Sequence, residues 1–138
     1  MPGDFPIHLF TLVCEDIRQE TLGKVSLLGV YNENIFFQKS PMRIRSLAFF
    51  TRFRGGKGTF SLLPRLRGPS GDLKKPDEPK STTFPASSES EHTLLGLVLG
   101  GIEFAEQGAY FYEIFFDDSP EPFVQVPLKV AIRPEVFR

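Results

Sequence analysis

The sequence has few of the residues on which most metal sites and nucleophilic enzymes depend. It holds one cysteine and two histidines in 138 residues. A lone cysteine excludes an internal disulfide, and because no CxxC or HxxxH spacing occurs, no zinc site is predicted. No lysine or arginine precedes Arg18, so the N-terminus lacks the cationic start of a signal peptide. These features together are typical of the reducing cytosol.

Long apolar runs and a strong net charge are missing as well. The longest nearly uncharged apolar run, residues 94–102, is too short to cross a bilayer. The net charge of −1 gives no overall attraction to nucleic acid or to a membrane. We therefore expect a cytoplasmic protein with no membrane partner and no cofactor.

The residues that are present favour a β-rich core. Hydrophobic residues make up 41% of the chain and include 15 Phe, while 12 Gly and 12 Pro interrupt it too often for long helices. A chain of this length buries roughly two-thirds of its unfolded surface. One domain covering residues 1–138 is predicted.

The clearest strand signal is at the C-terminal end. Apolar side chains alternate strictly along residues 124–133, and residues 109–117 form a second strand after which the acidic turn 117–122 closes a hairpin. Gly108 and Tyr110 resemble the start of strand F in immunoglobulin-like sandwiches, where a tyrosine bonds back to the preceding corner. The alternative is that Tyr110 is simply a core residue. Tyr112 stands where such domains have their second core cysteine, so no disulfide joins the sheets.

Further strands follow from alternation and turn residues. They are predicted over residues 6–15, 24–31, 35–38, 42–54, 59–67 and 92–104. The stretch 16–23 is predicted as a polar connection, 55–58 as a hairpin turn and 68–90 as a surface loop, mobile in part, with a short strand near 82–85. Pro64 and Pro127 favour edge strands, whereas the run 94–99 is apolar on both faces, as in a central strand. The fold class is all-β, an antiparallel two-sheet sandwich of the immunoglobulin-like kind, with a C2-like or jelly-roll eight-stranded sandwich as the alternative.

The strand 42–54 has an inconsistent face pattern. Arg43 and Arg45 occupy odd positions, whereas Arg52 and Arg54 occupy even ones. A flat strand would turn one pair inward, so a bulge or a sheet switch is predicted within residues 46–51.

The middle of the chain is basic. Residues 39–67 contain no acid, and phenylalanines lie among the basic residues. The candidate basic contact surface consists of Arg43, Arg45, Arg52, Arg54, Lys57, Arg65 and Arg67. Arginine beside exposed aromatic rings can hold single-stranded nucleic acid on this predicted strand pair. The favoured alternative is a solvated or protein-contacting face, or pairing with acids on later strands (Glu103, Glu106, Glu113 and Asp117).

No catalytic or metal-binding set is predicted. His8 lies inside the first strand, His92 begins another, and Cys14 ends the first, with no motif around any of them. A cysteine in that place is more often a small core residue than a nucleophile. The acidic residues of the turn 117–122 are interpreted as solvated rather than as calcium ligands.

One segment resembles a known family. The run C-E-D-I-R-Q-E, followed by G-K-V-S-L-L-G-V-Y at 23–31, is similar to the opening of a family of small uncharacterised bacterial proteins. The resemblance implies a cytoplasmic β-sandwich in a bacterium and brings no activity with it. From the residues, we expect a non-catalytic binding or adaptor domain that acts through protein contacts, with a homodimer possible. Nucleic-acid binding is the alternative hypothesis, and an enzymatic function is the least favoured one.

Overall fold

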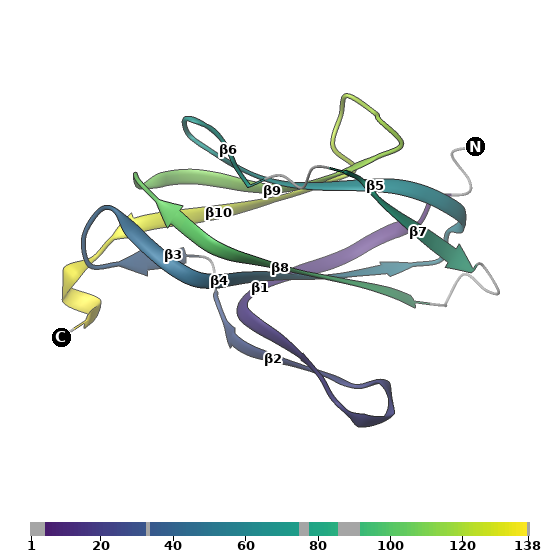
Figure 1. The fold of residues 1–138 in the computed structure, drawn as a ribbon, viewed down its shortest axis with the longest axis horizontal. Helices are drawn as coiled ribbons and strands as arrows, with labels where there is room; N and C mark the ends of the chain where they lie inside the picture. Colours follow the sequence, from purple (N-terminus) through teal and green to yellow (C-terminus); the bar gives the residue numbers. More distant parts are fainter. Residues whose placement is uncertain (1–4, 33, 75–77, 86–91, 138) are drawn as a thin grey trace.

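The computed structural model describes residues 5–32, 34–74, 78–85 and 92–137. Within them, ten strands form two sheets that lie one above the other (Figure 1). The strands are β1 (Ile7–Gln19), β2 (Val25–Val30), β3 (Asn34–Phe37), β4 (Met42–Arg54), β5 (Lys57–Gly68), β6 (Gly71–Lys74), β7 (Lys80–Pro85), β8 (His92–Phe104), β9 (Gly108–Phe116) and β10 (Val124–Ile132). Two short 3-10 turns, η2 (Thr21–Gly23) and η3 (Pro134–Phe137), complete the described elements.

The strand order confirms the predicted sandwich. One sheet runs β2-β1-β4-β8, and the other runs β3-β10-β9-β5-β6, with β7 also paired to β5. In immunoglobulin-like domains strands A, B and E lie in one sheet and G, F and C in the other. Here β1, β4 and β8 take the first set of places, and β10, β9 and β5 take the second. The short β3 pairs parallel to β10, and all other pairs are antiparallel.

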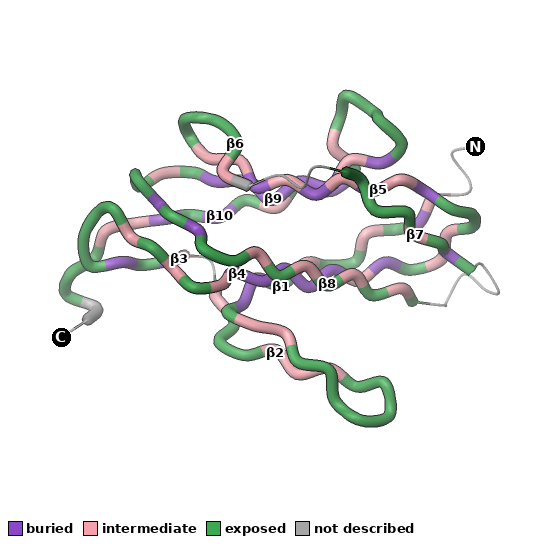
Figure 2. The backbone as a smooth tube through the Cα atoms, viewed as in Figure 1, coloured by how far each residue is buried: buried purple, intermediate pink, exposed green. Residues whose placement is uncertain are grey.

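Aromatic side chains join the two sheets. The ring of Phe49 on β4 stacks on that of Tyr112 on β9, with centroids 3.9 Å apart and planes 6° from parallel. A second group lies at one end of the sandwich and consists of Phe53, Phe60, Phe84 and Phe116. Figure 2 shows buried positions recurring along the strands of both layers, as alternation requires.

The tyrosine corner is confirmed. The hydroxyl of Tyr110 donates a 2.6 Å hydrogen bond to the backbone oxygen of Glu106, four residues earlier. Gly108, between them, adopts φ +144°, a conformation that favours glycine. The bond ties the start of β9 to the turn that precedes it.

The arginines of β4 do change face, but earlier than predicted and without the predicted bulge or sheet switch. Ile44 packs against the core, and so do Leu47 and Phe49, so the inward parity switches between residues 44 and 47 rather than within 46–51. The register with β8 is the same on both sides of the switch, which places Gly101, with φ +61°, opposite Arg45. Both strands therefore turn over together, and all four arginines of β4 avoid the core.

The stretch 55–58 is not a hairpin turn, so this prediction was wrong. β4 belongs to the four-stranded sheet and β5 to the six-stranded sheet. Gly55 and Gly56 adopt φ of 67° and 90°, and a Cβ added at Gly56 would lie 2.8 Å from Cβ of Pro6. Glycines permit a sharp bend in the chain. They do not determine whether the next strand pairs with the previous one or joins the other sheet.

Neither proline marks an edge strand. Pro64 lies in β5 and Pro127 in β10, and both strands have neighbours on two sides. Among the described residues, however, β7 pairs with β5 only up to Leu62 and β6 only from Leu66, while β3 reaches β10 only from Lys129. Each proline thus faces a gap in the ladder on one side, where its missing N–H is not needed.

Three further boundaries differ from the prediction. β8 is the edge of its sheet rather than a central strand. β1 continues through Gln19, so part of the predicted connection 16–23 is an extended hairpin with β2. The predicted loop 68–90 contains β6, which was not predicted, and β7, which confirms the short strand predicted near 82–85 and begins earlier, at Lys80. Residues 75–77 and 86–90 of this stretch lie outside the described part of the chain.

Gly101 offers a test of the face change. Because an L-residue in the left-handed region costs about 1–2 kcal/mol, Gly101→Ala should lower the free energy of unfolding by about 1 kcal/mol relative to Gly100→Ala. Gly100 lacks a positive φ, and a Cβ there meets only the backbone oxygen of Arg45 at 3.8 Å. Urea unfolding of the two variants measures the difference. Equal stabilities would mean that the strand pair does not turn over at Gly101.

Candidate interaction surfaces

The seven predicted basic residues do not form one surface. Arg43, Arg45, Arg52 and Arg54 lie on β4, and Lys57, Arg65 and Arg67 lie on β5. The two strands belong to different sheets and are not a strand pair. Because the arginines of both strands avoid the core, the basic residues of β4 and those of β5 point outward on opposite sides of the sandwich.

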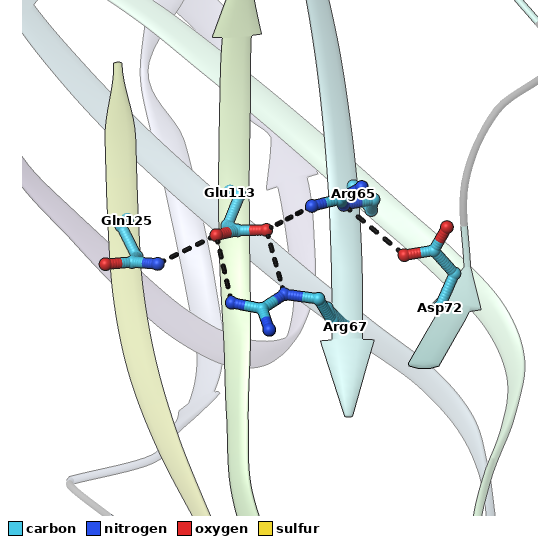
Figure 3. Close-up of polar contacts among 5 residues, drawn as sticks. All are labelled: Arg65, Arg67, Asp72, Glu113 and Gln125. Atoms are coloured by element: carbon cyan, nitrogen blue, oxygen red, sulfur yellow. Dashed lines mark hydrogen bonds and ion pairs between the residues drawn. The ribbon is translucent and has the colours of Figure 1, made fainter. Parts of the chain in front are cut away.

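Arg65 and Arg67 are held by a buried carboxylate, as one of the sequence alternatives proposed. Glu113 on β9 has only 3% of its side chain exposed, although it points away from the core. Its Oε1 accepts hydrogen bonds from Nη2 of Arg65 at 2.8 Å and from Nε of Arg67 at 3.2 Å (Figure 3). Its Oε2 accepts from Nε2 of Gln125 at 2.8 Å, and Asp72 pairs with the far side of Arg65.

Two phenylalanines complete this cluster. The guanidinium of Arg65 lies 4.8 Å from the ring centroid of Phe115, and that of Arg67 lies 5.0 Å from the ring of Phe111. Burial alone would raise the pKa of Glu113, but the hydrogen bonds from Arg65, Arg67 and Gln125 outweigh it and lower that pKa below its usual range. On the outer side of the six-stranded sheet, Arg65 and Arg67 are therefore paired within the chain.

This cluster makes stability depend on pH. The folded pKa of Glu113 lies below the unfolded value of about 4.3, so the stabilisation is present above that pH and is lost as the pH falls through the folded pKa. We expect Glu113→Gln to lower the free energy of unfolding by about 2 kcal/mol at neutral pH. The difference from the native chain should shrink below about pH 4.

The matched control is Glu103→Gln. Glu103 meets Arg43 at 3.4 Å, but both side chains are exposed, so its loss should change stability by no more than about 1 kcal/mol. Chemical unfolding at several pH values measures both variants. Equal effects would show that the Glu113 cluster contributes no more than a surface ion pair.

Arg45 lies in a different setting. It lines a hollow of about 700 Å³ between the β1–β2 hairpin and the first half of β4, together with the acidic Glu15 and Asp16. Charges of both signs line this hollow, so it is not a continuation of a basic surface.

The outward side of the four-stranded sheet carries apolar side chains as well as the arginines of β4. Adjacent partners in the ladder point to the same side, and this places Leu12 beside Phe50, and Ala48 between Cys14 and Val98. We name the exposed members of this side the outer apolar face. It consists of Phe10, Leu12, Val30, Leu94 and Val98, whose exposed fractions range from 36% to 51%. A sandwich face that meets only water would carry polar residues at these positions.

The β1–β2 hairpin folds over the middle of that side. A Cβ added at Gly96 of β8 would lie 3.3 Å from Cδ1 of Ile17, which belongs to a strand two places away in the sheet. Figure 1 shows the hairpin leaving the lower layer on its outer side. Cys14, Ala48 and Phe50 are buried there, whereas the outer apolar face, which includes Val30 at the end of β2, stays exposed.

A cavity lies beside the free edge of β8. It has a volume of about 170 Å³ and sits between β8 and the six-stranded sheet. Its lining consists of Leu62, Pro64, Glu78, Lys80, Leu95, Gly96, Leu97 and Tyr112. Tyr112 is fully buried, and its hydroxyl has no hydrogen-bond partner among the described residues. Burial raises the pKa of Tyr112 far above its usual value, so the hydroxyl keeps its proton and remains a donor.

The histidines and the cysteine lie apart from this cavity. His8 bonds the hydroxyl of Thr11, which bonds Thr51, and burial lowers the pKa of His8 below its usual value. His92 is exposed at the start of β8. Cys14 is fully buried and bonds the backbone oxygen of Asp16, and burial raises the pKa of its thiol, which disfavours the reactive thiolate.

Sequence reasoning missed the outer apolar face and the cavity. The signal was present, because residues 94–99 are apolar at both parities. That pattern indicates a strand with both sides covered, and it was interpreted as a central strand. The structure instead leaves Leu94 and Val98 exposed on its outward side and its edge without a paired strand among the described strands.

The fold and these surfaces define an all-β, two-sheet sandwich protein. More particularly, the chain belongs to a family of unknown function, DUF6941, whose model matches residues 9–131. No curated protein matches the chain in sequence. Within the described residues, no helix is long and apolar enough to cross a membrane.

Proposed function

We propose that this chain is a non-catalytic binding or adaptor domain of the bacterial cytoplasm, and that it acts through protein contacts on the outer apolar face. The observation that carries the proposal is the exposure of Phe10, Leu12, Val30, Leu94 and Val98 on one side of one sheet. Contiguous apolar patches on soluble proteins commonly mark interaction sites. Burying such side chains against a partner stabilises the complex by about 25 cal/mol for each Å² removed from water.

The two sides of the sandwich support this choice by contrast. On the six-stranded sheet, outward arginines are paired with Glu113 and covered by phenylalanines. On the four-stranded sheet, the outward apolar side chains have no such cover beyond the hairpin. The partner surface that fits is apolar at its centre, and acids at its rim would meet Arg52 and Arg54.

The chain offers a matched pair of variants to test the proposal. Phe10 on the outer apolar face and Phe36 on the six-stranded sheet are exposed to nearly the same extent, 36% and 38%. We expect Phe10→Lys to reduce capture of the partner at least tenfold and Phe36→Lys to leave it unchanged, because only the first places a charge in the contact. Tagged chain and nuclease-treated extract of the source organism, read by quantitative mass spectrometry, give the measurement.

Folding and self-association are checked in the same samples. Circular dichroism tests whether both variants keep the sandwich fold. Light scattering tests whether the captured partner is a second copy of the chain. Equal capture by both variants would contradict the proposal, as would equal loss.

Nucleic-acid binding is a second candidate, and one contact favours it. The guanidinium of Arg52 lies 5.9 Å from the ring centroid of the exposed Phe10, an arrangement suited to a phosphate and a stacked base. This function predicts binding of a single-stranded oligothymidine that weakens steeply with salt, and weakens further in Arg52→Glu and Arg54→Glu. Fluorescence anisotropy at low salt measures it, and no binding there would remove the candidate.

A further inference from the structure

The edge of β8 is unusually poorly protected. Among the described strands β8 pairs with β4 alone, so one row of its backbone N–H and C=O groups has no strand hydrogen-bonded to it, although the short β6 comes near β8. Natural edge strands carry lysines, prolines or inward charges that prevent another strand from adding. Residues 93–102 carry neither a charge nor a proline. This edge is therefore chemically suited to strand addition.

The cavity supplies a second and independent observation. Leu95, Gly96 and Leu97 of β8 form part of its lining, so a strand added to β8 would bring its inward side chains to this opening. The volume of about 170 Å³ corresponds to roughly six water molecules at about 30 Å³ each. A side chain of middle size fits such a space.

The hydroxyl of Tyr112 indicates that the entering side chain carries a hydrogen-bond acceptor. It is a fully buried donor without a partner among the described residues, in a lining that is otherwise mainly aliphatic. A hydrogen-bond acceptor would satisfy it, but a carboxylate at the buried hydroxyl would lose its hydration beside Leu62, Pro64 and Leu95. Lys80 of the same lining is exposed, so pairing with it would offset little of that loss. A neutral amide avoids that loss, and the exposed Glu78 in the same lining offers an acceptor for the amide N–H groups.

We propose, building on the binding function above, that β8 accepts an extended and uncharged segment of a partner protein as an added strand. One glutamine or asparagine side chain of that segment enters the cavity and accepts a hydrogen bond from Tyr112. Backbone pairing with β8 gives the affinity, and the cavity gives the preference for the amide.

A second copy of this chain does not meet the same requirement. If β8 paired with β8 of another copy, its inward side chains at the cavity would be leucines (Leu95, Leu97 and Leu99). The hydroxyl of Tyr112 would then remain without an acceptor. The observations therefore favour a different polypeptide as the occupant.

The test uses synthetic peptides of about ten residues, the length of a long strand, that alternate Val and Thr around one central guest residue. The guests are Gln, Asn, Ala and Glu, and fluorescence anisotropy measures binding to the native chain and to Tyr112→Phe. We expect the Gln or Asn peptide to bind the native chain about tenfold more tightly than the Ala peptide. Tyr112→Phe should bind the amide and Ala peptides equally, because it keeps the ring stack on Phe49 and removes only the donor.

Backbone pairing is tested with the preferred peptide methylated at alternate amide nitrogens. Methylation along one edge of the peptide should abolish binding and methylation along the other should not, because only one edge faces β8. Circular dichroism and thermal unfolding test whether Tyr112→Phe keeps the native fold.

Several results would overturn the inference. If the guests bind equally, the hydroxyl of Tyr112 takes no part in recognition. If both methylated peptides bind, the peptide does not add as a strand. If no peptide binds, β8 does not accept the proposed segment. None of these results depends on capture by the Phe10 and Phe36 variants, so failure here is separable from failure of the proposed function.

Discussion

The stack of Phe49 on Tyr112 is the contact on which the arrangement of the sandwich depends. It joins the middle strand of one sheet to the middle of the other at a centroid distance of 3.9 Å. Aromatic pairs contribute about 0.5–1.5 kcal/mol beyond the area they bury, and this pair also sets where the sheets lie relative to each other. It buries the Tyr112 ring fully while the hydroxyl finds no partner in the described core. The same contact that holds the sheets together thus leaves a donor beside the cavity at β8.

The outer sides of the two sheets differ in the side chains they expose. The larger sheet places Glu113 between Arg65, Arg67 and Gln125, so the charges of this cluster are paired within the chain. The smaller sheet presents apolar side chains outward and ends in β8, an uncharged edge. The hairpin of β1 and β2 covers only part of this side. A domain built in this way has one face that is complete in itself and one that gains stability from a partner.

Much of the fold follows from local pattern, because alternation and turn residues act over a few positions. The bounds of β4 and the tyrosine corner at Tyr110 could be predicted in this way. Which sheet a strand joins depends on distant contacts, so the crossing at Gly55 and Gly56 looked like a hairpin turn. The seven basic residues were grouped for the same reason, although the crossing sends them to opposite sides. The sequence pattern of an apolar strand such as β8 is the same whether a neighbouring strand or a partner protein covers it.

Hydrogen–deuterium exchange of the chain, alone and with its captured partner, would test the central claim most directly. The account predicts slower exchange on binding at the amides of β1 and β8, because the partner covers the outer apolar face and the free edge of the four-stranded sheet. The amides of β5, β9 and β10 should exchange as they do in the free chain. Protection confined to the six-stranded sheet, with β8 unchanged, would contradict the account and move the binding surface to the Glu113 cluster.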